Sequence, residues 1–327
     1  MPPGATLVTP KLLRASFFGA WHCTMRLPCG DRRITCPRPM TPFISISSGA
    51  LRCELRPDLG GCVAGLWFGE QQVLRSTAAD QLHDVRISAS YPLVPYSNRI
   101  AWRRLHWAGQ EFELPQNFAP EPHTIHGVGW ERPWQVEDAS ATHAVLGYRH
   151  GADGAWPFAF DSRQTFTLSG NALEMQISIT NRADVPAPAG LGWHPYFAKS
   201  EATQLRFAAA GRWEMDGDKL PTHRLPNAGL DTDCSSLDVD HCFDAWNGSL
   251  QLTEGGLRIQ VTSDLDCLVV FTTPGRDSIA IEPVSHVNNA LALAQQVGVT
   301  PESLGLRVLQ AGETFAASMR IQVEQLA

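Results

Sequence analysis

Strict alternation of apolar and polar residues constrains the fold of this chain more than any other feature. The segment ALEMQISITNRA, residues 172–183, shows it most clearly. Its apolar residues are Leu173, Met175, Ile177 and Ile179, and between them lie Glu174, Gln176, Ser178 and Thr180. A helix of about 3.6 residues per turn cannot separate these two sets, whereas a strand places them on opposite faces. The segment is therefore predicted to be a half-buried β-strand.

The same pattern recurs along most of the chain. LRCELRP at 51–57 alternates and leads through Gly60 and Gly61 into a second apolar run, which is typical of a β-hairpin. Further alternating segments are GLRIQVTS at 256–263, SIAIEP at 278–283 and SMRIQVEQL at 318–326. Helical periodicity is confined to 288–297. We therefore predict an all-β protein, a large antiparallel β-sandwich whose two sheets pack face to face.

Composition agrees with many short strands and narrows the classes of partner. The 327 residues include 27 glycines and 23 prolines, and only 18% are charged. No run of about 18 apolar residues exists, so no membrane-spanning segment is expected. The net charge of -7 argues against nucleic acid as a partner, because phosphate binding needs a basic surface.

The first 39 residues differ from the rest. They hold six basic residues against the single acid Asp31, and they show no alternation. We expect residues 1–39 to be a disordered or misassigned extension, and residues 40–327 to form a single domain whose functional start is Met40. The five cysteines after Met40 are odd in number and contain no C-x-x-C pair, so neither a disulfide framework nor a zinc site is expected. A reducing cytoplasm suits such thiols.

Five segments place polar residues where a strand pattern predicts packing, and these are the candidates for chemistry. YSNRIAW carries Asn98 and Arg99, HTIHGVGW carries His126, LGWHPYF carries His194, VDHCF carries Asp240, and IAIEPV carries Glu282.

Glu282 has the clearest environment of these candidates. If Ile279 and Ile281 face the core, Glu282 faces the other side of the same strand, and Pro283 is expected to end the strand just after it. A carboxyl group desolvated among aromatic rings has a raised pKa and can act as a general base near neutral pH.

Each candidate also has a purely structural interpretation. His194 and His126 could hydrogen-bond backbone carbonyls, Asp240 could stabilise a turn, and Arg99 could form a surface ion pair. The ten tryptophans are more often core residues than sugar platforms. A metal site at His123 and His126 has no carboxylate or thiolate partners at recognisable spacing, so no metal is expected.

Taken in chain order, the motifs resemble those of the aldose 1-epimerases, also called galactose mutarotases. These are N-R-I, H-G, W-H-P-Y-F, D-H-x-F, an acidic residue late in an apolar strand, and VLQAGETF before the last strand. The resemblance runs from about Leu51 to Val323 and implies a β-sandwich of the galactose mutarotase-like type. Pro283 and Val284 stand where many members have threonine and a polar residue, so the resemblance does not name the sugar.

The resemblance implies a role for each candidate residue. His194 would be the general acid that protonates the ring oxygen, and Glu282 the base that accepts the anomeric hydroxyl proton. His126 would hold and polarise the same region, while Arg99, Asn98 and Asp240 would bind sugar hydroxyls. Opening a hemiacetal needs one proton donor and one acceptor on nearly opposite sides of the ring and no redox step, so no cofactor is expected.

Three alternatives remain beside an epimerase of free aldohexoses. A hexose-6-phosphate 1-epimerase would need clustered cations, which Arg103 and Arg104 could supply, although alternating geometry lets only one of them face a ligand. A non-catalytic carbohydrate-binding protein would not require both His194 and Glu282. A glycosidase that pairs Asp240 with Glu282 would leave two histidines unexplained.

Overall fold

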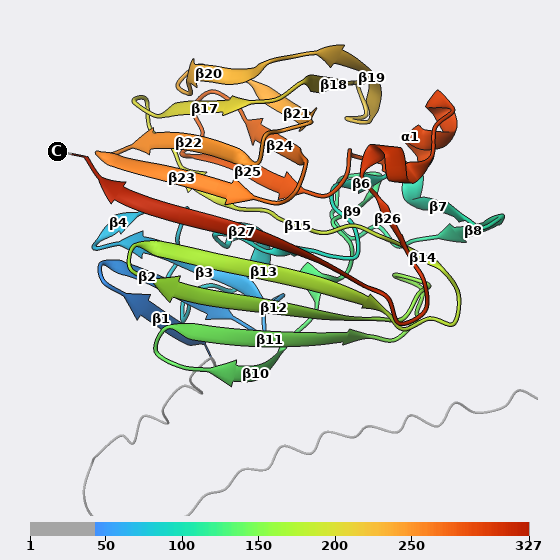
Figure 1. Ribbon diagram of the computed structural model, residues 1–327, viewed down its shortest axis with the longest axis horizontal. Coiled ribbons are helices and arrows are strands. Elements are labelled where there is room, and N and C mark those ends of the chain that lie inside the picture. Colours follow the sequence, from blue (N-terminus) through green and yellow to red (C-terminus); the bar gives the residue numbers. More distant parts are fainter. Residues whose placement is uncertain (1–42, 327) are drawn as a thin grey trace, which may run out of the picture. The chain divides into compact units, whose positions relative to one another are not determined.

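The structure is a computed structural model that describes residues 43–326, and two large antiparallel sheets dominate it (Figure 1). The nine-stranded sheet consists, in spatial order, of β10 (Gln135–Ala139), β11 (His143–His150), β12 (Phe160–Ser169), β13 (Ala172–Asn181), β27 (Thr314–Gln325), β23 (Leu257–Ser263), β22 (Ser249–Glu254), β17 (Gln204–Ala208) and β20 (Gly229–Asp233). The predicted strand at 172–183 is β13, and it pairs with β12 and β27.

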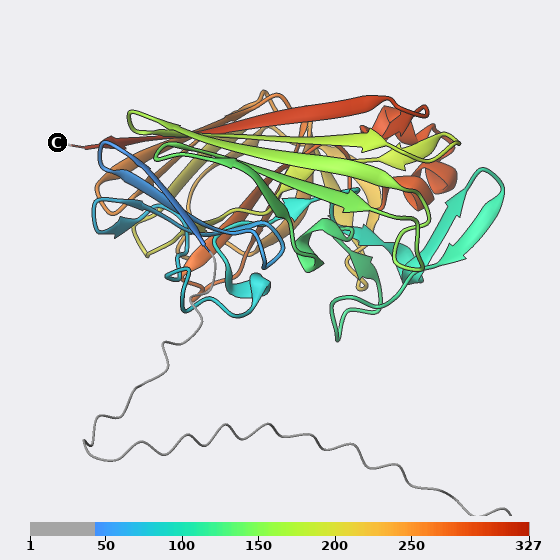
Figure 2. The same ribbon diagram turned by 90° about the horizontal axis from the view of Figure 1, so that it is seen from below.

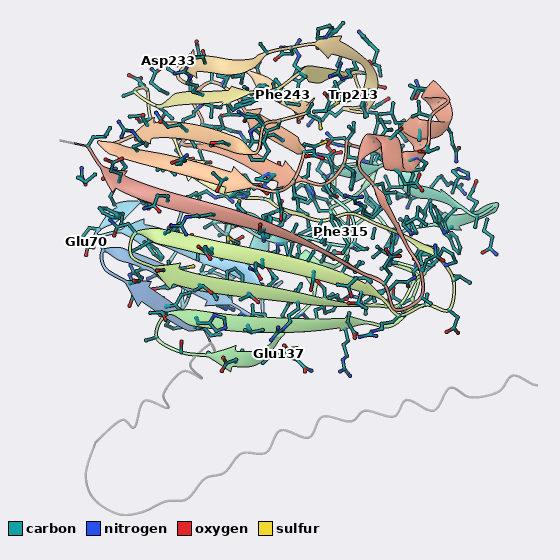
Figure 3. The ribbon with its side chains drawn as sticks, in the orientation of Figure 1. Glu70, Glu137, Trp213, Asp233, Phe243 and Phe315 are labelled. Carbon is teal, nitrogen blue, oxygen red and sulfur yellow. The ribbon has the colours of Figure 1, made fainter. Side chains whose placement is uncertain are left out.

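The eight-stranded sheet carries Asp240 and Glu282 on its strands and His194 in a connection between two of them. Its strands are β19 (Pro221–Pro226), β18 (Gly211–Met215), β21 (Val239–Asp244), β24 (Cys267–Thr272), β25 (Ser278–Val284), β15 (Gly192–Trp193) and β5 (Pro92–Leu93), and β16 (Tyr196–Ala198) pairs beside β15 on β25. In Figure 3, Trp213 and Phe243 mark β18 and β21 of this sheet.

Smaller elements surround the two sheets. A four-stranded sheet comprises β1 (Ile44–Ser48), β2 (Leu51–Arg56), β3 (Cys62–Phe68) and β4 (Gln71–Gln72), and the two-stranded pairs are β6 (Arg99–Ile100) with β9 (Thr124–Ile125), β7 (Arg104–Trp107) with β8 (Gln110–Glu113), and β14 (Ala187–Ala189) with β26 (Arg307–Leu309). The helix α1 spans Ala290–Val297, and short 3-10 turns lie at Val85–Ile87, Ala101–Arg103, Gly129–Glu131 and Pro301–Leu304. The β7–β8 hairpin projects from the body of the domain (Figures 1 and 2).

One hydrophobic core joins the two large sheets. Ile177 of β13 and Ile321 of β27 belong to the same buried cluster as Ile279 and Ile281 of β25. The opposite face of β25 is also covered, because Val284 belongs to a second cluster that includes side chains of α1. The prediction of a large antiparallel β-sandwich is confirmed, and so are the strand at β25, the hairpin β2–β3 and the helix near 288–297.

The expected end of β25 at Pro283 is wrong. Pro283 pairs with Leu268 of β24, and the strand continues to Val284, which pairs with Cys267 on one side and Gly192 on the other. Proline removes only its own N–H from the ladder and its fixed φ suits extended backbone, so pairing on both flanks carries the strand past it.

Two further expectations concern the ends and the cysteines. Residues 1–39 lie outside the described residues. Within residues 43–326 no helix is long and apolar enough to cross a membrane. The cysteines of this part of the chain, Cys53, Cys62, Cys234, Cys242 and Cys267, are buried free thiols.

Candidate active site

The site lies on the second face of the eight-stranded sheet. Register places Glu282 opposite Val269 of β24, and Val269 opposite Cys242 of β21. Directly paired residues share a face, so Glu282 and Cys242 project to the same side, away from Ile281. The next row of this face contains Asp240, which aligns through Phe271 with Ala280 and then with Tyr196.

His194 reaches Glu282 from the connection between β15 and β16. Its backbone N–H donates to the carbonyl of Tyr91 at 3.0 Å, and this fixes the turn. Its Nε2 lies 3.2 Å from Oε1 of Glu282, and the two side chains are only 7% and 3% exposed. Nδ1 of His194 and Oε2 of Glu282 are buried without a hydrogen-bond partner in the described structure. Buried polar atoms without partners are rare and costly, and here each member of one pair holds one.

Aromatic rings enclose the His194 side chain. Tyr196 stacks on the imidazole with ring centroids 4.5 Å apart, and Tyr91 lies 4.7 Å from it. The His126 ring meets it nearly at a right angle, 5.0 Å away. Such packing holds the imidazole orientation and excludes water from the pair.

Two neighbouring chain segments with left-handed backbone position His126. Asn98 and His126 both have positive φ, 57° and 65°, and they exchange two hydrogen bonds. The Asn98 N–H donates to Nδ1 of His126 at 3.1 Å, and the His126 N–H donates to the Asn98 carbonyl at 2.9 Å. Gly127 follows with φ 72°, and a Cβ there would lie 2.3 Å from the Val94 carbonyl oxygen, so the H-G sequence has a steric cause.

The hydrogen bond to Nδ1 determines the tautomer of His126 and the atom through which it can donate a hydrogen bond. Nδ1 is an acceptor, so in the neutral ring Nε2 carries the proton and is free to donate. Burial lowers the pKa of His126 well below its usual value, and the nearby His194 and Arg99 add to this effect. His126 is therefore a neutral hydrogen-bond donor.

Arg99 is anchored by a carboxylate that the sequence did not single out. Its Nε and Nη2 donate to the two oxygens of Glu121 at 3.1 and 3.2 Å, and Nη1 donates to Oδ1 of Asn98 at 3.2 Å. Burial is the largest single influence on the pKa of Glu121 and raises it, but the hydrogen bonds to Arg99 together with the charges of Arg99 and Lys219 and a contribution from His123 lower the net pKa. Arg99 is thus a buried ion pair of the site and not the surface pair that was its structural alternative.

Burial disfavours charge on both members of the central pair. It raises the pKa of Glu282 well above its usual value, with a further rise from Asp240 and an opposing effect from Arg99. It lowers the pKa of His194, and Arg75 lowers it further. The expected rise in the pKa of Glu282 thus has burial as its main cause.

The structure brings together the six predicted site residues, although Asp240 lies one row from Glu282 and is partly exposed. Arg103 and Arg104 instead pair with Glu113 and Glu111 on the β7–β8 hairpin. Within the part of the chain that the structure describes, no cluster of three or more His, Cys, Asp or Glu side chains could hold a metal ion. The sequence analysis did not find Tyr91, Arg75 or Glu121, which no local pattern distinguishes.

Comparison with known proteins identifies the family. The sequence model of the aldose 1-epimerase family matches residues 42–322. The chain belongs to this family. The uncharacterised protein YphB of Escherichia coli K12 is 28% identical over 300 residues, which cover 86% of this chain and 99% of YphB.

Solved structures extend the comparison to the fold. A putative aldose 1-epimerase from Escherichia coli K12 superimposes with a TM-score of 0.78 at 26% identity, covering 87% of this chain and 99% of that one. Galactose 1-epimerase from Lactobacillus acidophilus NCFM superimposes with a TM-score of 0.67 at 14% identity, covering 88% and 99% of the two chains, and shows the fold alone.

Proposed function

We propose that this member of the family is an aldose 1-epimerase that interconverts the α and β anomers of a free aldohexose. The observation that carries the proposal is the buried contact of 3.2 Å between His194 Nε2 and Glu282 Oε1. It pairs one group that can donate a proton with one that can accept it, and aromatic rings enclose the imidazole. The buried free thiols suit a reducing compartment, and we place the activity in the cytoplasm.

His194 and Glu282 together hold one exchangeable proton. It is on His194 while the sugar ring is closed and on Glu282 while the ring is open, so the reaction consumes no proton. His194 Nε2–H gives its proton to the ring oxygen O5 while Glu282 takes the proton of the anomeric O1. The C1–O5 bond breaks and C1=O1 forms, which leaves Glu282 protonated and His194 neutral. Rotation about C1–C2 and the reverse transfers then close the ring to the other anomer.

Direct contact between the two side chains differs from the opposed placement expected from the sequence. O1 and O5 are both bonded to C1, so two adjacent groups can reach them from one side. Burial favours the uncharged form of the pair, which is the form present when the sugar is open. Burial of the pair therefore stabilises the open-sugar stage relative to the closed-sugar stage, because the neutral pair of the open stage gains less from hydration than the ion pair does.

The other residues orient the sugar. Arg99, held by Glu121 and Asn98, and the Nε2–H of His126 supply donors for hydroxyl oxygens, and Asp240 supplies an acceptor. Proton transfer of this kind needs no cofactor.

Polarimetry tests the proposal. Freshly dissolved α-D-glucose and α-D-galactose are followed with and without the protein at a pH where spontaneous mutarotation is slow. We expect a faster approach to the same final rotation, lost in His194→Ala and retained in His83→Ala, which removes an exposed histidine. Acceleration with α-glucose 6-phosphate alone would indicate a phosphate substrate, and binding without acceleration would indicate a carbohydrate-binding protein.

A further inference from the structure

Arg75 is a cation without an acidic partner close to the catalytic pair. Its Nε donates to the Ser88 carbonyl at 3.3 Å, and its Nη2 donates to the carbonyls of Ser88 and Arg86 at 2.6 and 2.9 Å. Among the ion pairs of residues 43–326, none includes Arg75. Backbone carbonyls thus hold the guanidinium in place, and because they carry no net charge the guanidinium keeps its positive charge.

Both the backbone and the side chain of Arg75 contact Tyr196. The Arg75 N–H donates to the Tyr196 carbonyl at 2.7 Å, and its Cζ lies 3.7 Å from the centre of the Tyr196 ring. That ring in turn stacks on His194 with centroids 4.5 Å apart and planes inclined by 29°. The two distances laid end to end place the charge within about 8 Å of the imidazole.

We propose that Arg75 is a positioning residue for the epimerase reaction: it holds the Tyr196 ring against His194, and its uncancelled charge makes the His194 imidazolium a stronger acid toward the ring oxygen. This inference rests on the proposed function. The ring oxygen of a sugar is a weak base, so a more acidic donor protonates it more readily.

Other charged and titratable groups act on the same pair and define the background. Tyr91, His126, Tyr196 and Glu282 face His194; Asp240, Arg99 and Cys242 influence Glu282; and Arg276 influences Tyr196. Arg75 and burial both lower the pKa of His194, in the direction that the geometry requires. Unlike Arg99, which Glu121 neutralises, Arg75 acts with its full charge.

The test compares Arg75→Met, which removes the charge, with Arg75→Lys, which keeps the charge and loses the planar stack. In Arg75→Met we expect the limb of the kcat/KM profile of mutarotation that reports His194 to move to higher pH by about 0.4 to 1.5 units, for a charge about 8 Å from the imidazole and an effective dielectric of about 80 to 20. Arg75→Lys should leave the limbs at their wild-type positions. Arg307→Met removes a comparable cation over Phe315, which Figure 3 places on β27, and should shift nothing.

A second measurement separates this inference from the proposed function. Ring ¹⁵N shifts of histidine, assigned with His194→Ala, report the protonation of His194 without turnover. A shift of its titration to higher pH in Arg75→Met supports the inference even if no sugar is epimerised. Equal loss of kcat in Arg75→Met and Arg75→Lys, with pH profile and His194 titration unmoved, would reduce Arg75 to a structural residue and overturn it.

Discussion

Glu282→Gln is the most informative change to the site. The amide keeps the shape of a side chain that is 3% exposed and touches Nε2 of His194 at 3.2 Å, but it cannot accept a proton. Positioned general acid–base groups contribute about 10²- to 10⁴-fold to rate. We therefore expect kcat/KM for mutarotation to fall by that factor, which corresponds to about 3 to 5 kcal/mol in the barrier.

A double-mutant cycle with His194→Ala sharpens this prediction. The two side chains share one proton, so neither contributes to the rate when the other is absent. Substitutions in groups that act as a unit lower the rate in a strongly non-additive way. We expect the double variant to be no slower than the worse single variant, with rates measured by polarimetry on a fresh anomer and folding checked by circular dichroism. Near-normal activity in Glu282→Gln, or a double variant whose loss equals the product of the single losses, would refute the proton-sharing pair.

The same substitution predicts a pH dependence of stability. Burial raises the pKa of Glu282 above its unfolded value, so its stabilising contribution is complete at pH below the unfolded pKa and is lost as pH rises through the folded pKa. Glutamine stays neutral throughout. The melting temperature of Glu282→Gln relative to wild type should therefore rise as the pH increases from the unfolded pKa of glutamate, about 4.3, through the raised folded pKa. A difference that stays constant with pH would contradict the burial argument while leaving the kinetic prediction intact.

Two further changes probe the surroundings of the pair, and a third probes the core between the sheets. Glu121→Gln leaves Arg99 without its counter-charge and should raise KM about tenfold or more with a smaller change in kcat. The reason is that the Arg99 side chain would be misplaced for sugar binding, while the acid and the base remain. An unchanged KM would argue against Arg99 as a residue that binds the sugar. His126→Ala removes a neutral donor and should lower kcat/KM by about 10- to 100-fold without moving its pH limbs, as measured in the same assay. Phe166→Ala in the core between the sheets should lower the free energy of unfolding, measured in urea, by about 3 to 5 kcal/mol. A decrease below about 1 kcal/mol would mean that the core around Phe166 is not tightly packed.

The fold was predictable where one face of a strand is more polar than the other. β13 alternates from Leu173 to Ile179 because its outer face meets solvent, and the sequence shows this directly. β25 is buried on both faces along its whole length. Its two faces pack into two different hydrophobic clusters, so its alternating residues do not separate a buried face from a solvent-exposed one. This is why its end was misplaced at Pro283: a proline in a doubly paired strand gives the same local signal as a proline that ends one.

The candidate site was predictable only as far as its residues stand out locally. Asn98, His126, His194 and Glu282 interrupt apolar or aromatic runs, and the fold assembles them. Glu121 and Arg75 have ordinary sequence surroundings, and their roles follow from contacts made across the fold. A partner such as Tyr196 for Arg75 lies 121 residues away in the chain, and no spacing rule connects the two.

The backbone around His126 indicates why the donor set is built as it is. Left-handed backbone at a non-glycine residue costs about 1 kcal/mol or more, and here Asn98 and His126 both adopt it. The two mutual hydrogen bonds offset part of that cost, and one of them ends on Nδ1 of His126. A turn selected for stability alone would need no imidazole there, since glycine or asparagine adopts this conformation more easily. What the histidine adds is a fixed tautomer that leaves Nε2–H as the donor, in a ring 5.0 Å from that of His194. The strain therefore lies where a neutral, oriented donor is needed beside the catalytic pair.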